Sequence, residues 1–189
     1  MGTKLFKLWI LVKLKSLFLF IKLLNCYVKI TSNKKQVAII MGSASDYPIM
    51  RDAEKILRLL KINFDTKIVS AHRTPYRMFE FAKNAHKRYK VIIAGAGGSA
   101  HLAGMVSSLS RLPVIGVPIE TKSLKGLDSL LSVIQMPKGI VTATVAINNA
   151  NNAGLLAAQI LALFDKKVEK KFTEFRNKQT KSVKIKPKK

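Results

Sequence analysis

Three turns rich in glycine, serine and histidine dominate this sequence, at residues 41–46 (MGSASD), 70–75 (SAHRTP) and 95–101 (GAGGSAH). Each turn follows a short apolar run and precedes a stretch with helical spacing. In an open parallel sheet, the turns after successive strands gather along one edge, where helix N-termini and free backbone N–H groups meet an anionic ligand. The repetition therefore predicts that two histidines, an arginine, an aspartate and several hydroxyls converge there. Such a set can hold a phosphate and move a proton.

The segments between the turns alternate between strand and helix patterns. Short apolar runs bounded by turn residues are typical of strands buried on both faces of a sheet, and they lie at 37–41, 64–69, 91–94 and 114–117. Further along the chain, a fifth strand is expected near 142–147 and helices are expected over 126–134, 150–163 and 168–178. This alternation predicts an α/β fold in which right-handed crossovers join parallel strands.

The positive charge of the chain lies mostly outside this α/β region. The formal net charge is +24, and residues 1–35 carry eight lysines and no acidic side chain. Residues 165–189 carry eleven basic and three acidic side chains, and residues 36–164 carry fifteen and seven. The sequence therefore divides into a basic hydrophobic extension (1–35), one α/β domain (36–164) and a C-terminal helix with a lysine-rich tail (165–189). Because no nucleic-acid module or aromatic stacking platform accompanies the charge, nucleic acid is not an expected partner.

The N-terminal extension is strongly apolar over residues 5–30, but lysines interrupt it. No charge-free run approaches the ~20 residues that a membrane-spanning helix needs, and the pattern of a secretory signal is missing. On a helical wheel most of the lysines share one side, as in a helix that lies in a membrane interface, although Lys13 falls opposite. Three interpretations stay open: an upstream extension without function or a wrongly chosen start, an organelle or membrane-surface signal, and a segment that packs on the domain. We expect no firm membrane association.

The cysteine and histidine content limits the cofactors that this chain can use. Cys26, the only cysteine, lies in the extension, so the α/β domain can form neither an internal disulfide nor a cysteine metal cluster. Three histidines without cysteine partners do not form the pattern of a structural zinc site. The sequence also offers no Walker loop and no carboxylate cage. We therefore expect no cofactor and no metal, and a cytoplasmic location, with which this cysteine usage is compatible.

The run 153–163 (AGLLAAQILAL) has almost no polar face. An amphipathic surface helix would show one, so this helix is expected to be covered on several sides, by the sheet and by other subunits. A central helix buried within one subunit is the alternative. We favour self-association.

The first turn offers Ser43, Ser45 and Asp46 between a strand and a helix. Either Ser45 or Asp46 can serve as a helix N-cap, which alone would explain its presence. The turn can also bind a ligand, because Gly42 lets the backbone approach closely, a serine can donate to a phosphate and Asp46 can accept from hydroxyls. Both roles can coexist in different atoms.

The second turn places a cation where a helix is expected to begin. Pro75 suits the first helical turn and pushes the residue before it out of the α region, which explains the proline without a function. Arg73 is poorly placed with respect to the helix dipole, so its presence indicates an anion to bind, and a guanidinium matches the geometry of phosphate. Ser70, Arg73 and Ser45 are therefore the expected phosphate ligands. His72 is expected to face the ligand, although in isolation it would be an ordinary loop histidine.

The third turn combines glycines with a second histidine. Gly95, Gly97 and Gly98 allow tight turning and close backbone approach, although glycine-rich turns after strands are unspecific. His101 is expected to begin the next helix. His86, by contrast, lies among basic residues on a helix surface, and we assign it no role.

The segment 121–139 is longer and more polar than a minimal connection. Asp128 and Ser129 can cap its helix. The alternative is that the segment helps to close the site.

Five strings in this sequence carry a resemblance to a known family. In order along residues 36–163 they are MGSASD, SAHRTP, AGAGGSAHLAGM, PVIGVPIETKSLKGLDSLLSVIQMPKG and NAGLLAAQIL. They resemble the class I 5-(carboxyamino)imidazole ribonucleotide mutase of purine biosynthesis, the family of the phosphoribosylaminoimidazole carboxylase catalytic subunit. Ala103 stands where the family has proline, Ser99 where it has alanine and Asn148 where it has glycine. These departures concern loop geometry rather than chemistry.

The resemblance implies a fold, a reaction and a set of residue roles. The fold would be a three-layer αβα sandwich with a parallel, flavodoxin-like sheet, assembled as a homo-octamer. The reaction would convert 5-carboxyaminoimidazole ribonucleotide to 4-carboxy-5-aminoimidazole ribonucleotide in IMP biosynthesis. His72 and His101 would be catalytic, with His72 the first choice for the proton shuttle. The substrate-binding residues would be Ser43, Ser45, Asp46, Ser70, Arg73, Gly97, Gly98 and Leu102.

Two other functions stay open. A class II enzyme would carboxylate aminoimidazole ribonucleotide directly with carbon dioxide on the same fold. A non-catalytic nucleotide-binding or membrane-recruited module would bind without turnover.

Overall fold

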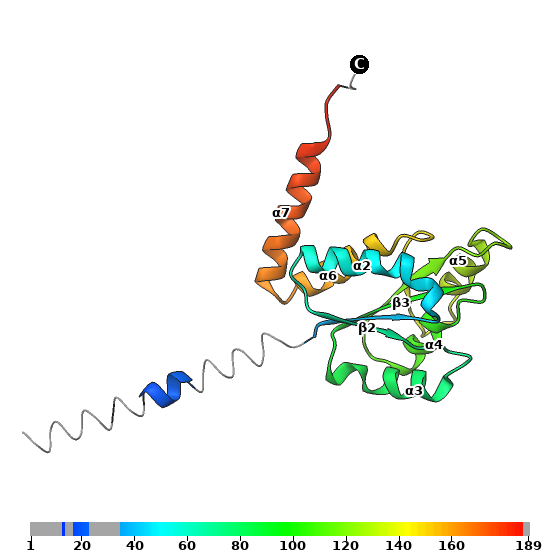
Figure 1. Ribbon diagram of the computed structural model, residues 1–189, viewed down its shortest axis with the longest axis horizontal. Helices are drawn as coiled ribbons and strands as arrows, with labels where there is room; N and C mark the ends of the chain where they lie inside the picture. Colours follow the sequence, from blue (N-terminus) through cyan, green and yellow to red (C-terminus); the bar gives the residue numbers. More distant parts are fainter. Residues whose placement is uncertain (1–12, 14–16, 23–34, 187–189) are drawn as a thin grey trace, which may run out of the picture. The chain divides into compact units, whose positions relative to one another are not determined.

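A computed structural model describes residue 13, residues 17–22 and residues 35–186 of the chain (Figure 1). The chain divides into two compact units, Met1–Lys34 and Lys35–Lys189. In the first unit, the described residues are helical and exposed. None of the helices in the described parts is both long enough and apolar enough to cross a membrane. Cys26 and most of the lysines behind the interfacial-helix interpretation lie outside the described residues.

The second unit alternates strands with helices. Its strands are β1 (Val37–Met41), β2 (Phe64–Ile68), β3 (Val91–Gly97), β4 (Val114–Ile119) and β5 (Ala143–Thr144). Its α-helices are α2 (Tyr47–Leu59), α3 (Pro75–Asn84), α4 (Leu102–Leu109), α5 (Leu127–Ile134), α6 (Ala150–Ala162) and α7 (Lys166–Ser182). Two short 3-10 helices, η1 (Ala44–Asp46) and η2 (Ala85–Lys87), follow β1 and α3.

All neighbouring strands of the sheet are parallel, in the order β2-β1-β3-β4-β5. This is the order of a flavodoxin-like sheet, so the predicted fold class is confirmed. The register places Met41, at the end of β1, opposite Gly95 of β3. The helix after β1 covers one face of the sheet and the helix after β3 covers the other, so the chain leaves these two adjacent strands in opposite directions. Open α/β sheets bind ligands at such a point.

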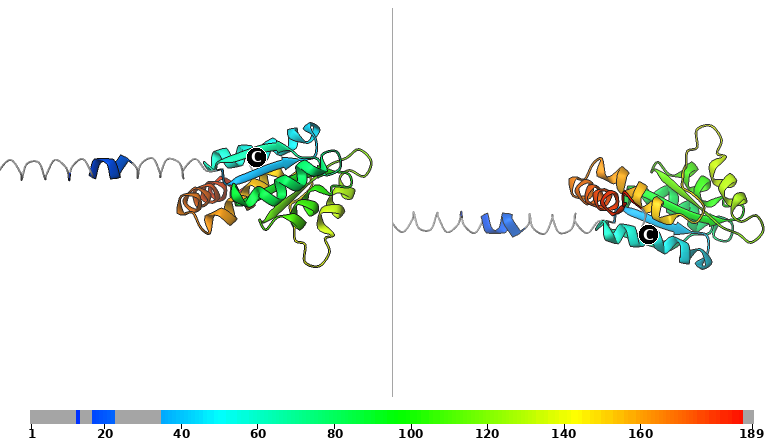
Figure 2. Two further views of the ribbon diagram at one scale, coloured as in Figure 1. Left: turned by 90° about the horizontal axis from the view of Figure 1, so that it is seen from below. Right: turned by 90° about the horizontal axis from the view of Figure 1, so that it is seen from above.

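Helices cover both faces of the sheet, and each face has its own apolar core (Figure 1). Ile39 of β1 packs with residues of α2, α6 and α7, whereas its neighbour Ile40 packs with residues of α3 and α4. In the view from above in Figure 2, α2 and α6 lie in front of the sheet. Successive residues of a strand point to opposite faces, so a continuous apolar run is what a doubly covered strand requires. The buried strands β1 and β4 and the first five residues of β3 follow this pattern.

The prediction that β2 is buried on both faces is wrong. β2 is an edge strand, and its residues are half-buried or exposed. Polar residues are accommodated because partners lie nearby: the Thr66 hydroxyl donates to the buried Glu54 carboxylate (2.6 Å), and Asp65 accepts from the Tyr89 hydroxyl (2.8 Å). Because β2 pairs with only one other strand, it tolerates the polar residues Asp65, Thr66 and Lys67 within its sequence.

The other strand boundaries also differ from the sequence pattern. β5 has two residues rather than the six expected over 142–147, because it pairs only with Ile115 and Gly116 of β4 before the chain turns at Asn148. β3 and β4 run further than predicted, since Gly97 still pairs with Ile119. Small residues and Pro118 weakened the strand signal at these ends without ending the pairing.

α6 packs within the chain, and its residues Leu155, Leu156 and Ile160 are half-buried there. It packs against α2, α7, β3 and β4. The approach to α2 is close, because a Cβ atom added at Gly154 would lie 3.0 Å from Cβ of Ile56. Packing within one subunit therefore accounts for part of the missing polar face, and cover by other subunits stays a prediction. α7 is longer than predicted, since Asp165 caps it by accepting from the N–H groups of Lys167 and Val168.

Asn148 has a backbone conformation that favours glycine, with φ of +59°. Its side chain holds Glu120, accepting from the Glu120 N–H (2.9 Å) and donating to the Glu120 carboxylate (3.0 Å). Asparagine enters the left-handed region more readily than most residues because its short polar side chain bonds locally. This accounts for an asparagine where the resemblance leads one to expect glycine.

Asn148→Ala should lower the free energy of unfolding by about 1–2 kcal/mol, because alanine keeps the left-handed strain and loses both side-chain hydrogen bonds. Asn148→Gly should cost less, since glycine relieves the strain. Chemical denaturation measures both, with Asn151→Ala on the exposed side of α6 as the control. A glycine variant less stable than the alanine variant would contradict this account.

Candidate active site

A cavity of about 400 Å³ lies where the chain leaves β1 and β3. All three predicted turns contribute to its wall, so the structure brings together residues that are far apart in the sequence. Eight of the ten predicted site residues line it, and Ser45 and Gly98 do not. The lining residues are Gly42, Ser43, Asp46, Ser70, Ala71, His72, Arg73, Ala96, Gly97, Ala100, His101 and Leu102.

The first turn is held by a capping box around η1. The Ser43 N–H donates to Asp46 Oδ2 (3.0 Å), and the Ser45 N–H donates to Ser43 Oγ (3.4 Å). The cap is therefore Ser43, whereas the sequence pointed to Ser45 or Asp46; Asp46 precedes α2 but makes no side-chain cap bond to that helix. The Ser45 hydroxyl donates to Asp46 Oδ1 (3.4 Å) and is exposed. This arrangement fixes the Asp46 carboxylate at the cavity wall.

The second turn holds Arg73 by its neighbours. Ser70 Oγ accepts from both the backbone N–H (3.2 Å) and Nε (3.3 Å) of Arg73. A terminal guanidinium nitrogen of Arg73 donates to the Gly42 carbonyl of the first turn (2.8 Å). Thr74 lies outside the α region (φ −136°, ψ 57°) and Pro75 begins α3, as predicted. The arginine is thus oriented across the start of α3 toward the first turn.

The two predicted histidines contact one another. His72 Nε2 and His101 Nδ1 are 2.8 Å apart, and the rings are nearly perpendicular at 81° with centroids 4.9 Å apart. One ring therefore donates and the other accepts, and a proton can pass between them along this bond. His101 stands at the N-terminal boundary of α4, as expected. Both side chains are exposed, so a ligand in the cavity can reach them.

The third turn shapes the wall with its backbone. Gly97 lines the cavity, whereas Gly98, at φ +64°, supplies the left-handed turn beside it. Leu102 is buried and closes the apolar side. The sequence interpretation missed Ala71, Ala96 and Ala100, whose small side chains leave room at the wall; the only signal for them was their place inside the three turns.

The segment after β4 is braced differently from the prediction. Gly126, at φ +86°, precedes α5, and neither Asp128 nor Ser129 caps the helix. Asp128 instead accepts from the Thr121 hydroxyl (3.0 Å), and the buried Ser129 hydroxyl donates to the Ile119 carbonyl (2.6 Å). These bonds attach α5 to the end of β4, and the capping interpretation is wrong.

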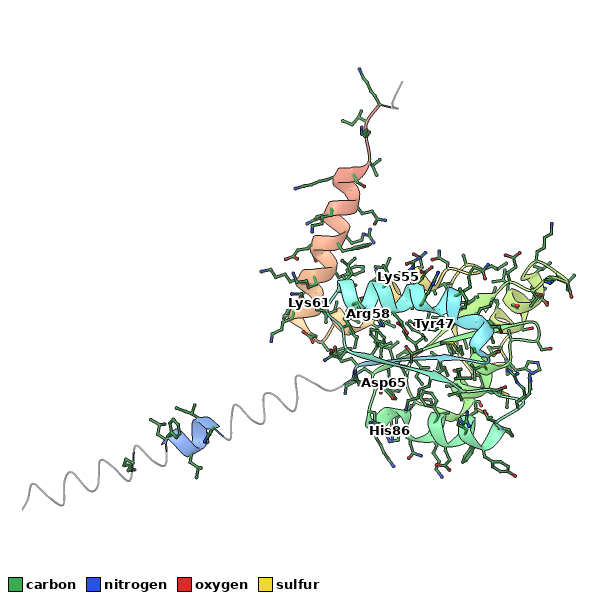
Figure 3. The ribbon with its side chains drawn as sticks, in the orientation of Figure 1. Tyr47, Lys55, Arg58, Lys61, Asp65 and His86 are labelled. Carbon is green, nitrogen blue, oxygen red and sulfur yellow. The ribbon has the colours of Figure 1, made fainter. Side chains whose placement is uncertain are left out.

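His86 lies away from the cavity. It is part of η2, beyond the C-terminal end of α3 (Figure 3). The cavity lies at the other end of that helix, where His72 and Arg73 precede its first residue. In the parts of the chain that the structure describes, no group of three or more metal-ligating side chains is placed to hold a metal ion.

Burial raises the pKa of Asp46 above its ordinary value of 3.8. Hydrogen bonds from the Ser43 backbone and the Ser45 hydroxyl, and the charge of Arg73, act in the opposite direction but are outweighed. The folded protein therefore binds this proton more tightly than the unfolded chain does. Asp46 contributes stability that is present below pH 3.8 and is lost as the pH rises through the raised pKa.

Asp46→Asn should remove this loss of stability, because an amide does not ionise. The free energy of unfolding of the variant, relative to the unmodified protein, should increase as the pH rises from below 3.8 to neutrality. Urea denaturation at a series of pH values measures the difference. A difference that is constant, or that falls with pH, would show that burial does not dominate at Asp46.

Comparison with known proteins matches the region that contains the three turns. The family model of AIR carboxylase matches residues 36–182. The N5-carboxyaminoimidazole ribonucleotide mutase of Thermotoga maritima is 56% identical over 149 residues, covering 78% of this chain and 87% of that protein. The phosphoribosylaminoimidazole carboxylase of Candida glabrata is 53% identical over 151 residues, covering 79% of this chain and 26% of that longer protein.

A solved structure has the same fold. The crystal structure of Treponema denticola PurE superimposes with a TM-score of 0.71 at 30% sequence identity, covering 77% of this chain and 92% of that one. The residues that the family model matches, 36–182, include all three turns that line the cavity. This chain belongs to the AIR carboxylase family.

Proposed function

We infer that this chain is an isomerase that converts 5-carboxyaminoimidazole ribonucleotide to 4-carboxy-5-aminoimidazole ribonucleotide. The observation that carries the inference is the His72–His101 contact of 2.8 Å in a cavity that also presents Arg73 and Ser70. A proton-transfer pair thus lies beside groups that can bind a phosphate. Two relatives that are each 56% identical, from Thermotoga maritima and Saccharolobus solfataricus, carry the mutase name.

The reaction moves a carboxyl group one way and a proton the other. The bond from the exocyclic nitrogen to the carboxyl carbon breaks and releases carbon dioxide, and ring carbon 4 attacks that carbon dioxide to form the new carbon–carbon bond. The proton that ring carbon 4 loses replaces the carboxyl group on the nitrogen. We assign this shuttle to His72, because histidine gains and loses protons readily near neutral pH. Holding the carbon dioxide beside ring carbon 4 gives a proximity advantage that free solution lacks.

The remaining turns bind the nucleotide in this scheme. We place the phosphate at Arg73, Ser70 and Ser45, and the ribose hydroxyls at Asp46. Ser43 lies nearer the imidazole and its carboxylate, with His101 orienting the carboxylate or assisting the shuttle. Gly97 and Leu102 form part of the wall around the ring, and Gly98 supplies the turn beside it.

We also propose that the chain assembles as a homo-octamer and acts in the cytoplasm. Exposed apolar side chains support self-association: Leu127, Leu131 and Ile134 of α5 are 51%, 49% and 50% exposed. Their spacing places them on one side of the helix. Light scattering on the purified protein tests the assembly.

The second candidate reaction is direct carboxylation of aminoimidazole ribonucleotide by carbon dioxide. The name of the Candida glabrata relative favours it. Feeding each substrate separately to the purified protein discriminates the two reactions. A mutase turns over the carboxyamino substrate, a direct carboxylase turns over aminoimidazole ribonucleotide with carbon dioxide, and a binding module turns over neither.

His72→Asn should abolish turnover while leaving nucleotide binding largely intact, because an amide can hydrogen-bond but cannot shuttle the proton. Loss of such a group typically costs about 10²–10⁴-fold in rate. A spectrophotometric assay beside isothermal titration separates rate from binding, with His86→Asn in η2 as the matched control. Near-normal turnover of the His72 variant would rule out the assignment.

Deletion of residues 1–34 should leave assembly and activity unchanged. This segment forms a separate unit, and the family match begins at residue 36. Light scattering and the substrate assay on the truncated protein test the expectation. Loss of either property would make the extension part of the working enzyme.

A further inference from the structure

A second hollow of about 270 Å³ adjoins the histidine-lined cavity. The two share Gly42, Ser43, Ser70 and Arg73, so Arg73 stands between them. The second hollow is lined in addition by Ala44, Ile68, Thr74 and Arg77, with no acidic side chain. The acidic group and both histidines line the first hollow, whereas a second arginine lines only the other.

Arg77 is a cation that the rest of the fold does not use. It lies in the first turn of α3, and Arg73 lies in the turn before that helix, so the two arginines line the same hollow from adjoining segments. Among the described residues, Arg77 has neither an ion-pair partner nor an aromatic ring beneath it. Arg58, an exposed arginine on α2, shows the contrast: it pairs with Glu54 (2.7 Å) and stacks over Phe64 (5.2 Å).

The position of Arg77 is also electrostatically unfavourable without a ligand. The first turn of α3 contains no acidic residue, so the helix dipole repels the guanidinium there. Arg73 already spends two of its five N–H donors on Gly42 and Ser70. The Thr74 hydroxyl is donated to the Ser70 carbonyl (2.9 Å). Arg77 therefore adds its donors to those that Arg73 leaves uncommitted in this hollow.

We propose that Arg77 is a positioning residue that shares the phosphate of the nucleotide with Arg73. The nucleotide then spans both hollows, with its imidazole at the histidines and its phosphate between the two guanidinium groups. A phosphate monoester carries nearly two negative charges at neutral pH, and two arginines match that charge where one does not. The assignment rests on the proposed function for the identity of the substrate, and adds a residue outside the three turns to its site.

The kinetic test compares Arg77→Ala with Arg77→Lys and with Arg88→Ala, an exposed arginine beyond η2. Arg77→Ala should raise KM for 5-carboxyaminoimidazole ribonucleotide about tenfold, with kcat changed less than twofold, because an anchor acts on binding rather than on chemistry. Arg77→Lys should restore part of the loss, since it keeps the charge without the fork. Arg88→Ala should behave as the unmodified protein does. Equal KM values for Arg77→Ala and the unmodified protein would overturn the proposal.

A binding test separates this inference from the reaction itself. Isothermal titration with 4-carboxy-5-aminoimidazole ribonucleotide, and with the ribonucleoside that lacks the phosphate, requires no turnover. Arg77→Ala should weaken binding of the nucleotide about tenfold and leave binding of the nucleoside unchanged. Equal weakening for both ligands would show that Arg77 acts on the fold and would overturn the proposal. An unmodified protein that binds the nucleotide but turns over neither substrate would refute the proposed function, while the titration would still decide the role of Arg77.

Discussion

The site depends on the parallel pairing of β1 with β3. Met41 lies opposite Gly95, and the Gly42 N–H donates to the Gly95 carbonyl (3.3 Å), so the pairing continues into the first turn. Met50 of α2 packs directly against Gly95, where an added Cβ would overlap its sulfur. This close contact fixes the start of α2 over the end of the sheet. The first turn is thereby held against the third, and the cavity opens between them.

The charged and proton-transferring side chains of the cavity come from three different turns. Asp46 comes from the turn after β1, and its carboxylate is engaged by backbone and hydroxyl donors. Arg73 comes from the turn after β2 and reaches back to the Gly42 carbonyl. The histidines come from two different turns and meet ring to ring. Because Arg73 and His72 come from the same turn, an anion bound at Arg73 would lie beside the histidine pair in one cavity.

Much of the site could be predicted from the sequence because its chemistry is local. A proline that begins a helix, a histidine and an arginine just before it, and glycines after a strand are readable without knowing any distant contact. Arg77 was not readable in this way, since it lies inside a helical stretch where an arginine is ordinary. Only its place in the second hollow, which adjoins the first at Arg73, distinguishes it. The roles of Asp128 and Ser129 were missed for a similar reason: their partners, Thr121 and Ile119, lie before the helix they were expected to cap.

The sequence by itself determined the alternation of strands and helices, the parallel sheet and the three turns at its carboxyl edge, because hydrophobic periodicity and turn chemistry act over a few residues. The tertiary structure decided which strand lies at an edge, as the polar residues of β2 show. It also decided that α6 packs between the sheet and the helices α2 and α7. Most closely tied to function, it brought Nε2 of His72 within 2.8 Å of Nδ1 of His101. Those outcomes depend on which elements pack together, and a contact between residues 29 positions apart leaves no local pattern to read.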